Sequence, residues 1–88
     1  RDLCISLGIV MTIEDSWGGE IATSAIAHLA HSTPSDFHFQ SSAFHDYHTL
    51  AIAGGGPIVE GGYMRASDAA GLGVEPDFDV LGQPVFAT

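Results

Sequence analysis

The chain has 88 residues and carries two Lys or Arg against eleven Asp or Glu, a formal net charge of −9. This balance argues against nucleic acid and anionic membrane surfaces as partners, because both require clustered basic side chains. No apolar stretch approaches the roughly 20 residues that span a bilayer, and an apolar fraction of 45% is too high for a disordered chain. The single Cys4 leaves no internal disulfide, so we expect a folded, reduced, cytoplasmic protein.

The first half of the sequence predicts alternating helices and strands. In chain order, we expect a helix over 2–7 that stops at Gly8, a strand over 9–14, a helix over 20–31, a strand over 37–41 and a weaker helix over 44–53. Phe37 and Phe39 should share one side of the second strand. This order predicts an α/β fold with right-handed crossovers. Two strands are too few for a parallel sheet buried on both faces, so we expect them to belong to a larger sheet or barrel.

The second half of the sequence differs in composition. Residues 54–63 are rich in Gly and predict turns around short extended pieces. Residues 71–85 have no clear period, so we expect a tail that packs against another segment.

The helix over 20–31 divides into two faces at 100° per residue. One face is apolar and holds Ile21, Ala22, Ala25, Ile26, Leu29 and Ala30. The other holds Thr23, Ser24, Ala27, His28 and His31. We expect this second, more polar face to lie against solvent or a neighbouring subunit.

The loop over 14–19, with the sequence EDSWGG, is the first candidate site. In α/β folds, ligands bind where strands end and loops lead into helices. Alternation should point Glu14 and Asp15 in opposite directions, Trp17 could stack on a ligand or face a cation, and the two glycines would expose backbone N–H groups to an anion. Two structural alternatives stay open: Asp15 or Ser16 could cap the helix, and Trp17 could fill an interface.

The histidines form a second candidate site. His28 and His31 are three residues apart, as are His45 and His48, a spacing that can bind zinc on a helix. No Cys accompanies them, so solvated or locally hydrogen-bonded histidines are favoured. The alternative function from this pattern is a small acidic zinc-binding module.

Two long stretches carry a family resemblance. MTIEDSWGGEIATSAIAHLAHSTP, residues 11–34, resembles the seventh strand and helix of the barrel domain in the enolase superfamily of mandelate racemase and muconate lactonizing enzyme. GGPIVEGGYMRASDAAGLGVEPDFDVL, residues 55–81, resembles the C-terminal segment of these proteins, with Ala70 where Pro is common. The stretch around Trp17 is most similar to the branch that handles proline derivatives, dehydratases of cis-3-hydroxyproline and epimerases of hydroxyproline betaine.

The resemblance implies a fold and a reaction. Residues 1–53 would be the C-terminal part of a (β/α)8 barrel, strands 7 and 8 with their helices, and residues 54–88 would pack on the barrel and on an α+β capping domain. The reaction would be Mg²⁺-dependent removal of the proton α to a carboxylate followed by loss of water, with racemisation, epimerisation or cycloisomerisation as the alternative. The catalytic Lys bases and the Mg²⁺ ligands would lie upstream of Arg1, leaving no catalytic or metal residue in this chain.

The resemblance also implies a substrate-binding edge. The residues expected there are Glu14, Asp15, Ser16 and Trp17 at the mouth of strand 7, and Gln40 and Ser41 at the mouth of strand 8. The partner would be a small carboxylate or amino-acid substrate, and the protein would form a homo-oligomer. The 88 residues alone are expected to be inactive.

Overall fold

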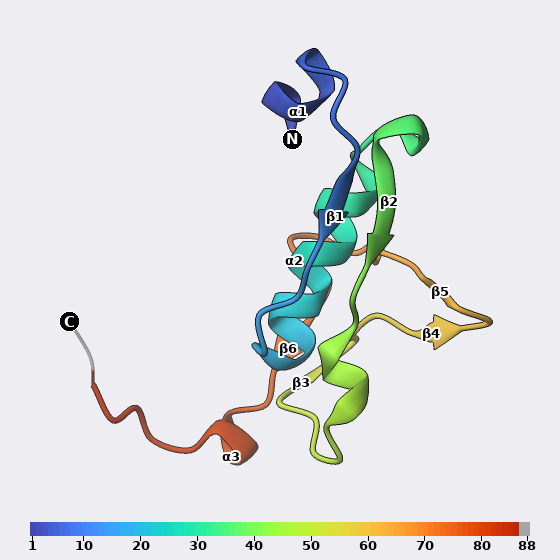
Figure 1. Cartoon of the computed structure of the whole chain (residues 1–88). Helices are drawn as coiled ribbons and strands as arrows, with labels where there is room; N and C mark the ends of the chain where they lie inside the picture. Colours follow the sequence, from blue (N-terminus) through green and yellow to red (C-terminus); the bar gives the residue numbers. More distant parts are fainter. Residues whose placement is uncertain (87–88) are drawn as a thin grey trace.

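A computed structural model describes residues 1–86 of the chain. Its centre is a parallel pair of strands, β1 (Met11–Ile13) and β2 (His38–Ser41), connected by the 13-residue helix α2 (Gly19–His31) (Figure 1). The short helix α1 (Asp2–Ser6) precedes β1, and the 3₁₀ turn η1 (Ser35–Phe37) precedes β2. The order of helix, strand, helix and strand expected over residues 2–41 is therefore confirmed, although β1 is shorter than the strand expected over 9–14.

The pairing of β1 with β2 contains a bulge at Phe39. Met11 pairs with His38, but the next residue, Thr12, pairs with Gln40, and Ile13 pairs with Ser41. A bulge inserts one extra residue and shifts every later pair by one position. The expectation that Phe37 and Phe39 share one side of a strand is wrong, because Phe37 belongs to η1 and Phe39 is the extra residue, with 74% of its surface exposed.

Helix α2 buries the face that was expected to lie against solvent or a partner. Thr23, Ser24 and Ala27 are buried, whereas Leu29 of the apolar face is exposed. Small side chains allow close approach to the strands, and the Thr23 hydroxyl finds a buried partner in Asp15. The expectation holds only at the helix end, where His31 is exposed.

The weak helical pattern over 44–53 yields only the 3₁₀ turn η2 (Phe44–Tyr47). The backbone becomes extended at His48. Further along, the N–H of Ile52 donates to the Glu20 carboxylate and its carbonyl accepts from Asp77. Because these partners replace the intrahelical hydrogen bonds, the expected helix is wrong from residue 48 onwards.

The C-terminal part is built from two-residue strands and turns. β3 (Ala53–Gly54) pairs with β6 (Glu75–Pro76), and β4 (Val59–Glu60) pairs with β5 (Tyr63–Met64), both antiparallel. The β3–β6 pairing confirms that the segment expected to lack periodicity packs against another part of the chain. At Gly55, φ is +79° and an added Cβ would lie 2.7 Å from the Gly73 carbonyl oxygen, so the turn after β3 requires glycine.

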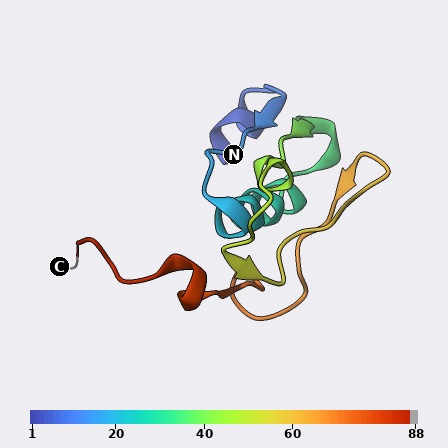
Figure 2. The ribbon, with the colours of Figure 1, turned by 90° about the horizontal axis from the view of Figure 1, so that it is seen from below.

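The last elements extend away from the helix and strands. Seen from below, the β4–β5 hairpin and the stretch with α3 (Phe78–Leu81) leave the body on opposite sides (Figure 2). Residues 87–88, the end of the segment expected over 54–88, lie outside the described residues. Within residues 1–86, no helix is long and apolar enough to cross a membrane.

Candidate functional site

The carboxyl ends of β1 and β2 lie side by side, as their parallel pairing requires (Figure 1). Glu14 and Asp15 follow β1, and Ser42 follows β2. The Ser42 hydroxyl accepts a hydrogen bond from the Asp15 backbone N–H at 2.7 Å and donates one to Glu14 Oε2 at 2.8 Å. The two carboxylates point in opposite directions, as the sequence predicts: Asp15 is buried against α2, and Glu14 is exposed.

The Asp15 carboxylate joins three segments of the chain and is only 7% exposed. It accepts hydrogen bonds from Thr23 Oγ1 on α2, from the Ser16 N–H at 2.6 Å and from the Phe44 N–H on η2 at 3.1 Å. Burial raises the pKa of Asp15, but these hydrogen bonds and one from the Trp17 backbone outweigh it and hold that pKa below its ordinary value. Asp15 therefore binds the loop as a charged carboxylate.

Trp17 packs on aromatic residues of the loop that follows β2. Its ring centroid lies 4.5 Å from that of Phe44, 6.2 Å from that of Tyr47 and 5.7 Å, edge-on, from that of His48. The residue is still 61% exposed. Its φ of +66° is in the left-handed region, which costs an L-residue about 1–2 kcal/mol. Such strain is typical of binding sites, where the surrounding contacts maintain it.

The start of α2 uses glycine instead of a side-chain cap. Gly18 is the N-cap residue, and no side chain caps the helix, so the capping alternative for Asp15 or Ser16 is not observed. The Ser16 side chain is exposed next to Trp17.

Glu20, in the first turn of α2, binds the loop after η2. Its carboxylate is buried and accepts a hydrogen bond from the Ile52 N–H at 2.9 Å. Burial raises the pKa of Glu20, but hydrogen bonds from its own N–H and from those of Ile52 and Ala53 hold it below its ordinary value, with help from nearby His45. Two buried carboxylates thus fix both loops at the strand ends.

Gln40 and Ser41 lie one step before this cluster. Together with residues of α2 and the β4–β5 hairpin, they line a cavity of about 460 Å³. Ser41 Oγ is 2.9 Å from His38 Nε2. The structure brings Glu14, Asp15, Ser16 and Trp17 together with residues 42–48. Gln40 and Ser41 instead line the cavity between β2, α2 and the hairpin.

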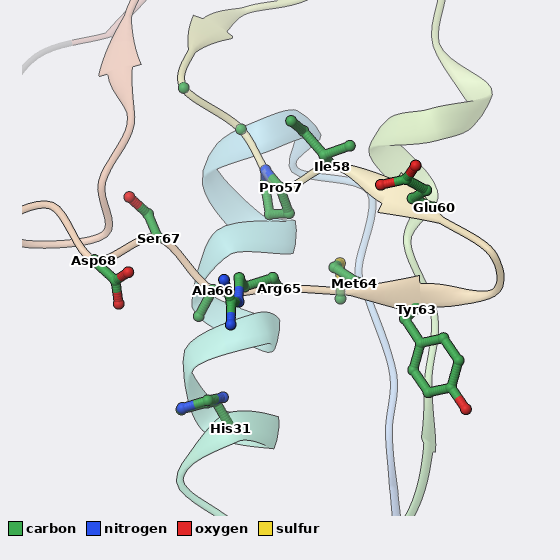
Figure 3. Close-up of a pocket in the computed structure, with 12 residues that line it drawn as sticks. His31, Pro57, Ile58, Glu60, Tyr63, Met64, Arg65, Ala66, Ser67 and Asp68 are labelled. Carbon is green, nitrogen blue, oxygen red and sulfur yellow. The ribbon is translucent and has the colours of Figure 1, made fainter.

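A second cavity, of about 650 Å³, is lined by residues from the stretch 55–68 and by His31 at the end of α2. Figure 3 shows the chain crossing in front of the helix at Arg65 and Ala66, with Ser67 and Asp68 beside the helix and His31 further along it. None of the six residues expected to bind substrate lines it.

The paired histidines have separate neighbours. His28 Nε2 is 3.3 Å from the Leu72 carbonyl oxygen, and His45 Nε2 is 2.7 Å from the Pro57 carbonyl oxygen, whereas His48 packs on Trp17. Among residues 1–86, no three His, Cys, Asp or Glu side chains are grouped closely enough to hold a metal ion.

Several residues of the strand-end cluster are not predicted by the sequence alone. Ser42 stands next to the predicted Ser41, but only the bulge at Phe39 places it opposite Glu14. Phe44 and Tyr47 lie in the stretch expected to form a helix over 44–53, yet they contact Trp17. The buried position of Thr23 had no local signal, because its partner is Asp15, eight residues away.

The family follows from comparison with known proteins. Residues 1–80 match the family described as enolase C-terminal domain-like, and the chain belongs to this family. The expected superfamily and the mixed α/β class are therefore confirmed, whereas the assignment of β1 and β2 to barrel strands 7 and 8 stays a prediction.

One named relative and two solved structures are similar to almost the whole chain. A protein of Roseibium aggregatum named cis-3-hydroxy-L-proline dehydratase is 60% identical over 85 residues, 97% of this chain and 23% of that protein. A crystal structure from Roseovarius nubinhibens ISM, described as mandelate racemase/muconate lactonizing enzyme, matches with a TM-score of 0.91 and 49% identity over 98% of this chain and 23% of that chain. Another structure from that organism, described as complexed with magnesium, has a TM-score of 0.90 and 31% identity over 98% of this chain and 24% of that chain.

Proposed function

We propose that the full-length protein containing this chain is a lyase that dehydrates cis-3-hydroxy-L-proline. The supporting observation is the 60% identity to the relative of that name, which extends over 97% of this chain. Because the chain spans only 23% of that relative, the activity is proposed for the longer protein.

The proposed reaction removes one proton and one hydroxide from the substrate. A Lys outside this chain takes the proton from Cα, the C3–O bond breaks, and the hydroxide leaves as water after protonation. The resulting enamine tautomerises to a Δ1-pyrroline carboxylate. General acid–base steps of this kind require groups positioned within hydrogen-bond reach of the reacting atoms.

The Mg²⁺ that we expect for this reaction does not fit the residues of this chain. No three potential ligands are grouped among residues 1–86. We therefore place the metal ligands elsewhere in the longer protein and derive no step through the ion.

The contribution of this chain is recognition of the substrate. Trp17 offers an exposed indole, and Glu14, three residues earlier in the same loop, supplies an exposed carboxylate. An aromatic face and a carboxylate suit the cationic ammonium of an amino acid, because both attract positive charge. We propose Ser16, Gln40 and Ser41 as further polar contacts. Asp15 belongs to the same site but acts through the loop, because its carboxylate is occupied by other segments.

The proposed architecture follows the resemblance. β1 and β2 would be barrel strands 7 and 8, with residues 1–53 in the barrel and 54–88 packed on barrel and capping domain. Leu3, Leu7 and Phe39 are exposed large apolar side chains in the described residues. Their burial by the remainder of a barrel would account for them. We also propose that the full-length protein is a homo-oligomer.

The test is turnover by the full-length enzyme. We expect cis-3-hydroxy-L-proline to yield the pyrroline product, detected with a reagent that traps cyclic imines and by mass spectrometry. The runner-up, supported by the resemblance of the Trp17 loop, is an epimerase of a proline betaine. Absence of the pyrroline product, combined with exchange of the betaine α-proton in D₂O, would replace the first proposal by the second. The alternative of a zinc-binding module does not fit the family better. Stoichiometric zinc in the purified full-length protein, with no dependence of its activity on Mg²⁺, would support that alternative.

A further inference from the structure

Ser42, which the proposed binding edge does not include, contacts two groups at once. Its Oγ lies 2.7 Å from the Asp15 backbone nitrogen and 2.8 Å from Glu14 Oε2. The side chain is half-buried, at the point where β2 leaves the parallel pair. It therefore connects the end of one strand with both the backbone and a side chain of the other.

The direction of these two hydrogen bonds is fixed by chemistry. A backbone N–H can only donate, so Ser42 Oγ accepts from Asp15. An ionised carboxylate can only accept, so the single hydroxyl proton of Ser42 is donated to Glu14. Hydrogen bonds to ionised groups are the stronger class. The Asp15 N–H thus orients the Ser42 hydroxyl, and the hydroxyl orients the Glu14 carboxylate.

The bulge at Phe39 is what delivers Ser42 to this position. Before the bulge, paired residues differ by 27 in number, as in Met11 with His38; after it they differ by 28, as in Ile13 with Ser41. Continued by one residue, the second register places Ser42 opposite Glu14, and the hydrogen bond is found there. Without the bulge, Ser41 would stand opposite Glu14.

We propose that Ser42 is a positioning residue that holds the Glu14 carboxylate in the orientation needed to bind the substrate ammonium. The proposal rests on the proposed function, because that function gives Glu14 its ligand. With Oε2 held by Ser42, Oε1 is the oxygen assigned to the ammonium. A free Glu side chain must lose rotamer freedom on binding, and Ser42 removes much of that freedom beforehand.

The test is a double-mutant cycle in the full-length enzyme with cis-3-hydroxy-L-proline as the probe. We expect Ser42→Ala to raise KM about tenfold and to change kcat by less than twofold. Glu14→Ala should raise KM at least as much. In the double variant, removal of Ser42 should raise KM less than it does in the wild type, because Glu14 is gone and only the hydrogen bond from the Asp15 N–H is still lost. An equal effect of Ser42→Ala with and without Glu14 would overturn the proposal.

Two further variants separate positioning from general disturbance. Ser42→Thr keeps the hydroxyl and should restore KM to within about threefold of the wild type. Ser35→Ala removes an exposed serine of η1 and should leave both constants unchanged. Failure of Ser42→Thr to improve on Ser42→Ala would argue against the role of the hydroxyl.

The outcome stays readable if the proposed function fails. A wild-type enzyme that does not dehydrate the probe refutes the function, and the same cycle is then measured on α-proton exchange of a proline betaine. Urea unfolding of the four proteins provides a second readout that needs no substrate. We expect the midpoint shift of the double variant to be smaller than the sum of the single shifts. Additive shifts would overturn the Ser42–Glu14 coupling itself.

Discussion

The strand ends and the C-terminal segment of this chain satisfy their backbone polar groups in different ways. At the strand ends, side chains reach across long sequence separations: Ser42 binds Asp15, and Glu20 binds Ile52. Side-chain hydrogen bonds within residues 54–86 are local: the Ser67 and Asp77 side chains accept from N–H groups two or three residues away. The first region therefore depends on particular side chains, whereas the second depends on its backbone.

A binding loop can be held rigidly only where side chains of other segments fix its backbone. The Trp17 loop has a strained backbone, which persists only where surrounding contacts fix it. Asp15 fixes the loop because its carboxylate accepts hydrogen bonds from Thr23 of α2 and from the Phe44 N–H of η2. Side chains from other segments contact the C-terminal segment at its backbone carbonyl groups, as His45 does at Pro57. Any residue at that position would provide the same carbonyl group. Substitutions should therefore have large effects at the strand ends and small ones in the tail.

Asp15→Ala should produce the largest effect. The substitution leaves the buried Thr23 hydroxyl and the N–H groups of Ser16 and Phe44 without their acceptor. We expect a loss on the order of 3 kcal/mol in the free energy of unfolding of the full-length protein. Urea unfolding measures it. Asp36→Ala, at an exposed position of η1, is the control and should cost less than about 0.5 kcal/mol. Equal losses of unfolding free energy in Asp15→Ala and Asp36→Ala would contradict the role of the Asp15 hydrogen bonds in fixing the strand ends.

Trp17→Leu should come next, and it tests recognition. The full-length enzyme should lose about tenfold in substrate affinity, in line with a cation–π contribution of about 1–2 kcal/mol. Its affinity for Mg²⁺ should stay within about twofold. Trp17→Phe keeps an aromatic face, so its substrate affinity should lie between those of the wild type and Trp17→Leu. Steady-state kinetics and Mg²⁺ titration provide the measurements. A larger change in Mg²⁺ affinity than in KM would show that Trp17 packs an interface and does not bind the substrate.

Glu20→Gln should have a smaller effect, with a characteristic pH dependence. The amide oxygen can still accept from Ile52, so we expect a loss of about 1 kcal/mol at pH 7. Because the folded-state pKa of Glu20 lies below its unfolded value, its stabilisation is complete above the unfolded pKa and is lost as pH falls through the folded pKa. The stability difference between wild type and variant should therefore shrink below about pH 4. A difference that is constant from pH 7 to pH 3 would contradict the charged state assigned to Glu20.

The sequence predicts the α/β order well because its signals are local. Gly8, the strand of β-branched residues and the Ala-rich period of α2 each depend on nearby residues. The opposite directions of Glu14 and Asp15 follow from strand geometry alone. The sequence also places a candidate site at the ends of the two strands, and substrate binding by its six residues stays a prediction.

The remaining features depend on long-range contacts. Thr23 turns inward because Asp15 lies eight residues before it, and residues 48–53 leave the helical path because Glu20 and Asp77 take the backbone groups of Ile52. The bulge at Phe39 shifts the register by one residue, which no periodicity in β2 reveals. The contact of Ser42 with Glu14 therefore has no signal in the sequence, and substrate binding by Ser41 stays a prediction.

Phe78→Ser should have the smallest effect if the tail is as free in the full-length protein as in this structure. Phe78 begins α3, and 75% of its surface is exposed. An exposed substitution without partners changes the free energy of unfolding by less than about 0.5 kcal/mol. The proposed packing of residues 54–88 on a capping domain predicts a different result, because burial of a Phe side chain contributes about 1.5–3 kcal/mol. Urea unfolding of full-length Phe78→Ser, compared with Asp79→Ser at the next position, separates the two. A loss above about 1 kcal/mol for Phe78→Ser alone would show that the tail is covered in the longer protein, and the contrast with the strand ends would then hold only for residues 54–77.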